Sequence, residues 1–206
     1  MTSDVPLVQG FPSWISPSDF CNKFSRQRKT ENAIFVASNC KTTSNCRSEY
    51  ARELMEHVEV HSYGRCLNNR PFPPAFSTAR KGKKFWLDKV RIMQNYTFAL
   101  VFENSNMHDY VTEKLFQALL AGCIPIYMGA PNVRDFLPAN NAAILVSEFQ
   151  SAEELAVYIK RVKENVTMRE ELLSWRDRPL PASFLRLWNL SWDTAKCRIC
   201  QVLAGR

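Results

Sequence analysis

The run YTFALVF at residues 96–102 decides the fold, because it is rich in aromatic and aliphatic residues and carries no charge, as is typical of a buried strand. A polar loop, ENSNMHDY at residues 103–110, follows it. Apolar residues at helical spacing then predict a helix over about residues 111–121. IPIYM at residues 124–128 predicts the next buried strand, and this order of strand, helix and strand is typical of a parallel sheet.

The same alternation continues on both sides of this segment. The sequence therefore predicts an α/β fold, a Rossmann-like parallel sheet with helices on both faces. Residues 1–30 lack periodicity and are predicted to be an irregular lead-in, with the domain at residues 31–206. Further strands are predicted at 33–38, 58–62 and 142–146, and further helices at 47–57 and 133–136. Residues 64–92 are predicted to be a loop that ends in a helix. Another helix is predicted to begin at Ser151, which forms a capping box with Glu154.

Composition limits the class of protein. With 206 residues, 46% of them hydrophobic, the chain has enough apolar material for a sizeable core. Its net charge of +7 is concentrated in residues 20–30 and 70–91. These two basic patches are compatible with nucleic acid, a membrane surface or a sugar nucleotide, and also with a solvated lysine face. No apolar run is long enough to span a bilayer, and residues 1–10 do not resemble a signal peptide, so the protein is either cytosolic or a piece of something longer.

Cysteine and asparagine usage favours an oxidising lumen. Seven cysteines are many for a cytosolic chain of this length. Three sequons predict N-glycosylation at Asn95, Asn165 and Asn189. Taken alone, Cys197 and Cys200 are compatible with half a zinc site, a redox dithiol or a structural disulfide.

The loop after residue 102 is the predicted ligand site, because ligands of open α/β sheets bind beyond the carboxyl ends of the strands. The helix after it offers free N–H groups and a positive dipole end, which suit a phosphate. Lys114 and Tyr110 are placed to face one ligand, while Glu113 and Glu103 can accept hydrogen bonds from ribose or sugar hydroxyls. Thr112 is, with Glu103, a secondary candidate. A polar loop with a Glu-Lys pair is also common on solvated surfaces, and neither GxGxxG nor a P-loop is present.

Several motifs together resemble the α1,3-fucosyltransferase family, in order and spacing, from about residue 30 to residue 200. The pattern is most similar to the plant-type core α1,3-fucosyltransferases and to a divergent animal branch. The motifs are FALVFENS at 98–105, DYVTEKL at 109–115, GCIPIYMG at 122–129, FVASNC at 35–40, Arg47, VHSYGRCLNN at 60–69 and CRIC at 197–200.

This resemblance implies the C-terminal, GDP-fucose-binding half of a GT-B type glycosyltransferase. Arg47 and Lys114 would neutralise the pyrophosphate, and Tyr110 and Asn104 would bind phosphate or fucose. Glu113 would hold ribose hydroxyls. The family needs no metal or other cofactor, since the two bases replace the metal. The implied reaction is inverting transfer of L-fucose in α1,3 linkage to GlcNAc of glycoprotein glycans in the Golgi apparatus.

The resemblance also implies what lies elsewhere in the family. The general base and the membrane anchor belong to an N-terminal acceptor-binding half, for which residues 1–30 are too few. We therefore expect a truncated form that binds GDP-fucose without transferring it. Resemblance and compartment favour a disulfide between Cys197 and Cys200, with Cys123 as a free thiol in the core. The pairing of the cysteines at positions 21, 40, 46 and 66 stays open.

Two alternatives remain from the sequence. One is protein O-fucosyltransferase activity, because a core GlcNAc, a Lewis-type antenna and a protein hydroxyl are all possible acceptors. The other is a non-catalytic module that binds an anion or nucleotide sugar. In that case the bases of residues 80–91, interleaved with Phe85 and Trp86, would hold nucleic acid or a sulfated glycan. We expect GDP-fucose and a glycoprotein acceptor as partners, and no nucleic acid.

Overall fold

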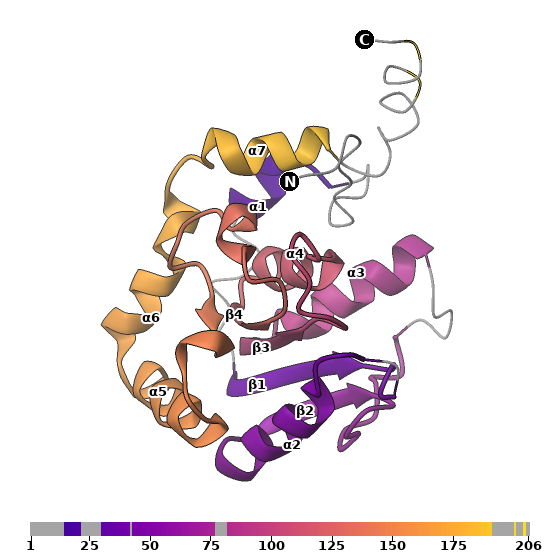
Figure 1. Ribbon diagram of the computed structural model, residues 1–206, viewed down its shortest axis with the longest axis vertical. Coiled ribbons are helices and arrows are strands. Elements are labelled where there is room, and N and C mark those ends of the chain that lie inside the picture. The colour runs from indigo at the N-terminus through magenta and orange to yellow at the C-terminus, as the bar shows by residue number, and fades with distance from the viewer. Residues whose placement is uncertain are drawn as a thin grey trace.

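A five-stranded parallel sheet lies at the centre of the molecule, with its strands in the order β2-β1-β3-β4-β5 (Figure 1). The structure is a computed structural model that describes residues 15–21, 30–41, 43–76 and 82–190, together with Cys200 and Ala204. Each neighbouring pair of strands is parallel, which confirms the predicted α/β class. The strands are β1 (Thr30–Ala37), β2 (Val60–Gly64), β3 (Tyr96–Phe102), β4 (Ile124–Met128) and β5 (Ile144–Leu145).

Helices cover both faces of the sheet, as predicted (Figure 1). One face packs against α1 (Pro17–Cys21), α3 (Gly82–Met93), α4 (Glu113–Leu120) and α7 (Ala182–Asn189). The other packs against α2 (Arg47–His57), α5 (Ala152–Glu164) and α6 (Val166–Leu173). Short 3₁₀ segments lie at η1 (Val133–Phe136), η2 (Val146–Glu148) and η3 (Ser174–Asp177). Within the described ranges, none of the helices has the length and apolar character needed to cross a membrane.

Strand β3 shows why an uninterrupted apolar run is needed here. Successive side chains of a strand point to opposite faces. Phe98 and Leu100 belong to the core on the α2 and α5 side, whereas Ala99 and Val101 belong to the core on the α4 side. Because both faces are covered, the strand is apolar except at Thr97, which is partly buried and donates its hydroxyl to the Thr30 carbonyl. The polar–apolar alternation of a half-exposed strand is therefore absent.

The predicted irregular lead-in contains a structured segment. Residues 17–21 form α1, and the Phe20 side chain is 1% exposed. Its ring meets that of Phe184 on α7 edge to face, with centroids 5.6 Å apart. The Phe184 side chain is also fully buried. The start of the described chain is therefore part of the same core as its last helix.

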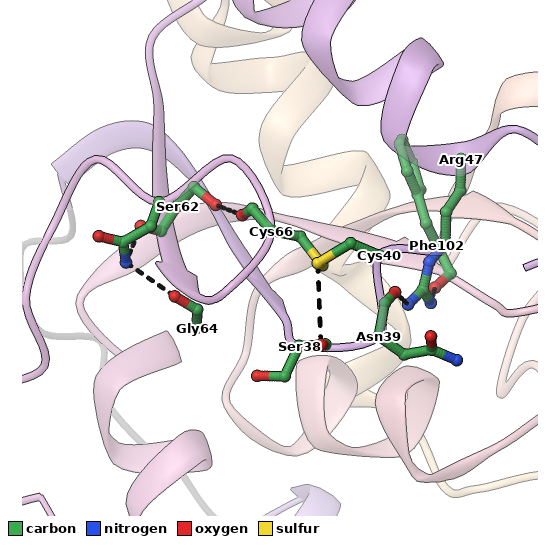
Figure 2. Close-up of a disulfide and its surroundings, with 9 residues drawn as sticks. Ser38, Asn39, Cys40, Arg47, Ser62, Gly64, Cys66 and Phe102 are labelled. Atoms are coloured by element: carbon green, nitrogen blue, oxygen red, sulfur yellow. Dashed lines mark hydrogen bonds between the residues drawn. A yellow bond between two sulfur atoms is a disulfide. The ribbon is translucent and has the colours of Figure 1, made fainter. Parts of the chain in front are cut away.

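A disulfide joins Cys40 to Cys66, with the two Cα atoms 5.4 Å apart (Figure 2). It links the segment after β1 to the segment after β2, which also meet where the N–H groups of Arg65 and Cys66 donate to the Ala37 carbonyl at 3.0 Å. The pairing that the sequence left open is thus settled for these two residues. Cys46 is an exposed free thiol.

The prediction for the other cysteines is half confirmed. Cys123 is a buried free thiol, as expected. Cys200, however, is an exposed free thiol, so the predicted Cys197–Cys200 bond is wrong for this structure. Cys197 itself lies outside the described residues.

Removing the disulfide should lower stability measurably. For the Cys40→Ala/Cys66→Ala variant we expect a loss of about 3.5 kcal/mol in the free energy of unfolding, from the closure entropy of a loop with a sequence separation of 26. Equilibrium urea unfolding under non-reducing conditions measures the difference, with Cys200→Ala as the matched control because its thiol is exposed and free. Equal unfolding midpoints for the double variant and the control would contradict the prediction.

Candidate functional site

The candidate site lies at the carboxyl ends of β1 and β3, where the strand order reverses. β2 flanks β1 on one side and β4 flanks β3 on the other, so the chain leaves the two central strands in opposite directions. At such a point open α/β sheets bind their ligands, in the crevice beyond the carboxyl ends of the strands. Residues 38–41, 43–46 and 103–112 border this edge.

Hydrogen bonds tie these two segments together across the edge. The Ser44 N–H donates to the Asn104 carbonyl at 3.0 Å. The Asn45 amide donates both to the Glu103 carbonyl, at 3.0 Å, and to Asn106 Oδ1, at 2.8 Å. Asn45 could not be predicted from the sequence, since one asparagine in a loop of small polar residues carries no distinctive signal. Its contacts fix the relative position of the two segments.

Arg47 is the first residue of α2 and is 2% exposed. Its Nη1 donates to the Phe102 carbonyl and its Nη2 to the Asn39 carbonyl, both at 2.7 Å (Figure 2). The guanidinium thus spans the ends of β3 and β1. Its Nε is buried and has no hydrogen-bond partner among the described residues. Burial lowers the pKa of Arg47, while Glu103 and Tyr110 lie close enough to act in the opposite direction.

Glu103 follows β3 directly and is completely buried. Its carboxylate accepts hydrogen bonds from the Thr112 N–H at 2.8 Å, from Thr112 Oγ1 at 2.8 and 3.0 Å, and from Lys114 Nζ at 2.8 Å. The Lys114 side chain is 24% exposed, so its ammonium sits between this buried acid and the crevice. The two secondary candidates, Glu103 and Thr112, therefore lie behind Lys114 and support it. They do not face the solvent.

The turn before α4 is held in a strained conformation by a residue from the next loop. Asp109 has φ 63°, in the left-handed region. Its N–H donates to Asn132 Oδ1 and its Oδ1 accepts from Asn132 Nδ2, both at 2.9 Å. This reciprocal pair fixes the backbone next to Tyr110, whose N–H donates to the Met107 carbonyl at 3.1 Å. Asn132 could not be predicted from the sequence either, because it lies in a different loop, after β4.

Close packing explains the glycine at the end of β4. A Cβ atom on Gly129 would lie 2.5 Å from the Tyr127 hydroxyl and 2.8 Å from Glu103 Cγ. The Tyr127 hydroxyl in turn accepts a hydrogen bond from the Ala130 N–H at 3.0 Å. Burial raises the pKa of Tyr127, and the nearby Glu103 raises it further. Any side chain at position 129 would displace the buried acid that supports Lys114.

The structure thus brings the five primary candidates to one edge of the sheet. Glu113 begins α4 with a side chain 33% exposed, 3.8 Å from Lys89 Nζ. The sequence-predicted candidates at this edge are Arg47, Asn104, Tyr110, Glu113 and Lys114. An unpartnered buried guanidinium N–H and a half-buried ammonium suit an anion with two charged groups, such as a pyrophosphate. Among the described residues, no group of three or more His, Cys, Asp or Glu is placed to hold a metal ion.

The C-terminal model of glycosyltransferase family 10 (fucosyltransferase) matches residues 26–206. The chain belongs to this family. Relatives include GDP-fucose protein O-fucosyltransferase 3 of Xenopus laevis, 40% identical over 191 residues, which are 85% of this chain and 40% of the relative. The protein of the same name from Gallus gallus is 38% identical over 194 residues, 86% of this chain and 40% of the relative. The chain thus spans about two-fifths of these relatives.

Solved structures of the family share the fold. A crystal structure of an α1,3-fucosyltransferase superposes with a TM-score of 0.63 at 26% identity, over 91% of this chain and 50% of that one. A second, solved with GDP, gives a TM-score of 0.59 at 25% identity, over 82% of this chain and 47% of that one. The family resemblance and the GT-B type fold predicted from the sequence are both confirmed.

Residues 82–91, the described part of the basic stretch predicted at 80–91, do not form a surface suited to nucleic acid. The Phe85 ring meets Phe76 edge to face at 5.5 Å, and Trp86 packs against the core. These rings are occupied by the protein itself, whereas single-strand binding uses rings that bases can stack on. Lys83 and Lys84 are exposed, as a solvated face requires, but Lys89 is not.

Proposed function

We propose that the edge formed by β1 and β3 binds GDP-fucose, and that the chain supplies the donor-binding half of a fucosyltransferase. The observation that carries this proposal is the pair of cations at the switch point. Arg47 has a buried Nε without a partner, and Lys114 is held at the crevice by a buried acid. Membership of glycosyltransferase family 10 supports the same donor.

The two cations suit the chemistry of fucosyl transfer. The acceptor oxygen forms a bond to C1 of fucose from the face opposite the nucleotide, while the bond from C1 to the β-phosphate oxygen breaks. The acceptor loses its proton to a base, and GDP leaves with one more negative charge than it carried in the donor. Fixed cations beside the pyrophosphate stabilise that developing charge more in the transition state than in the ground state. No metal is then needed for this purpose.

The remaining candidates surround the same position. We propose that Tyr110 and Asn104 donate hydrogen bonds to the phosphates or to fucose, and that Glu113 accepts hydrogen bonds from ribose hydroxyls. The clamp between Asp109 and Asn132 supports this assignment for Tyr110, because it fixes the backbone from which the phenol extends. Thr112 and Glu103 do not contact the ligand but hold the Lys114 ammonium in place through hydrogen bonds.

For the acceptor we propose a hydroxyl of a protein, ahead of GlcNAc in α1,3 linkage. The relatives named GDP-fucose protein O-fucosyltransferase 3 are 38–40% identical in chicken and Xenopus laevis. The solved α1,3-fucosyltransferases are 25–26% identical. The higher identity favours the protein acceptor, and transfer to GlcNAc is the second candidate.

We also propose that the chain works in the lumen of the Golgi apparatus, with any membrane attachment through a segment outside these residues. The Cys40–Cys66 disulfide supports an oxidising compartment. Asn95 and Asn165 are exposed, and Asn165 caps α6 through Oδ1 only, at 3.1 Å from the Met168 N–H. Its amide nitrogen is therefore the best placed of these sites for an N-glycan. The Asn189 side chain lies outside the described residues.

Isothermal titration calorimetry with the 206-residue chain tests the donor proposal. We expect micromolar binding of GDP and of GDP-fucose, and much weaker binding of guanosine, which lacks the pyrophosphate that both cations would contact. Equal affinity for guanosine and GDP would contradict the assignment of Arg47 and Lys114. RNA binding that falls steeply with salt, without GDP binding, would favour the anion-binding alternative.

A further inference from the structure

Lys89 differs from the other lysines of the basic stretch around it. Its side chain is 14% exposed, whereas Lys83 and Lys84 on the first turn of the same helix are exposed. Helix α3 lies beside α4 on one face of the sheet (Figure 1). The Lys89 chain therefore runs between two helices before its ammonium reaches the end of α4 that borders the crevice.

The contacts of this ammonium point to the candidate site. Lys89 Nζ is 3.8 Å from Glu113 Oε1 and 5.4 Å from the centroid of the Phe85 ring. Burial lowers the pKa of Lys89, Glu113 raises it, and the like charge of Lys114 lowers it again. Lys89, Glu113 and Lys114 thus form one electrostatic group at the first turn of α4.

A buried ammonium restricts the carboxylate next to it. Taking Lys89 out of water is unfavourable unless an anion stays close, so Glu113 is held on the side that faces Lys89. A glutamate at the start of a helix, 33% exposed, would otherwise sample several rotamers. Ribose hydroxyls are recognised best by an acceptor whose direction is already fixed before the ligand arrives.

We propose that Lys89 is a positioning residue that orients the Glu113 carboxylate for the ribose hydroxyls of the nucleotide, an inference that rests on the proposed function. Lys89 acts through Glu113 and does not contact the pyrophosphate. It therefore sets discrimination between ribose and deoxyribose, whereas Lys114 and Arg47 set affinity for the diphosphate.

The test compares GDP with 2′-deoxy-GDP by calorimetry on the 206-residue chain. The unmodified chain is expected to bind GDP about tenfold more tightly than 2′-deoxy-GDP. A hydrogen bond to a charged acceptor contributes a free energy that corresponds to about this ratio of affinities. In Lys89→Met the preference should fall to nearly one, through weaker GDP binding with little change for 2′-deoxy-GDP. Lys84→Met, which removes an exposed lysine from the same helix, should keep the preference.

Two further measurements keep the test independent of folding. Both ligands are titrated into portions of the same sample, so the ratio of their dissociation constants does not depend on the folded fraction. In addition, Lys89→Arg should restore most of the preference for GDP. If Lys89→Met weakened the binding of both ligands equally, or left the preference for GDP unchanged, this inference would be overturned. The proposal that the chain binds GDP would still stand. Absence of GDP binding by the unmodified chain would instead overturn the proposed function, and this inference with it.

Discussion

Replacing Lys114 with methionine is expected to weaken GDP binding by about a hundredfold. The ammonium is the half-buried cation that faces the crevice, and truncating one member of a desolvated charge pair costs about 3 kcal/mol or more. Calorimetry with GDP measures the loss. Lys160→Met on α5 is the matched control, because this lysine is exposed and far from the β1 and β3 edge in sequence and fold.

Lys114 also neutralises Glu103, so a stability effect must be separated from a binding effect. Lys114→Met leaves a buried carboxylate with Thr112 as its remaining partner, which should lower the melting temperature. Adding Glu103→Gln removes that charge and should restore stability without restoring GDP affinity. Recovery of GDP binding in the double variant would show that Lys114 acts only as the counter-ion of Glu103.

Arg47→Met is expected to destabilise the fold by about 3 kcal/mol and to abolish GDP binding. The guanidinium donates to the carbonyls of Phe102 and Asn39, and removing it breaks one buried and one part-buried hydrogen bond to a charged donor. Equilibrium urea unfolding measures the first effect. Arg47→Lys keeps the charge but has no fork to span both carbonyls, so it should recover only part of the stability.

If Arg47→Met were as stable as the unmodified chain, the hydrogen bonds from Arg47 to the two carbonyls would not stabilise the fold as we expect. Arg47→Lys also separates the two effects of Arg47. If it binds GDP with substantial affinity despite reduced stability, charge at this position serves the ligand. If it is stable but does not bind, the planar guanidinium and its free Nε are what the ligand requires.

The sequence was most informative where one physical requirement dominated. β3 and β4 have the predicted bounds, since a strand covered on both faces is almost entirely apolar. Helix α2 also has its predicted bounds. β5 is shorter than predicted, with Ile144–Leu145 paired to β4, because an apolar run alone does not say how many residues meet a neighbour. α4 begins at Glu113, since Thr112 is engaged by Glu103.

The sequence predicted which residues form the candidate site, but not which way their side chains point. Arg47 and Lys114 lie at the predicted edge, yet Glu103 faces inward, which no residue spacing could indicate. α1 and Lys89 were missed for a related reason. Phe20 is buried by a helix distant in sequence, and Lys89 is buried between α3 and α4, so both depend on tertiary contacts that propensity and periodicity do not encode.

Hydrogen–deuterium exchange with and without GDP tests the central claim most directly, because it locates the ligand on the chain. We predict that saturating GDP slows exchange in residues 38–48 and 103–114, the segments that border the ends of β1 and β3. Residues 166–173, which form α6, should be unchanged. GDP binding with protection elsewhere, and none in the two segments, would contradict the account.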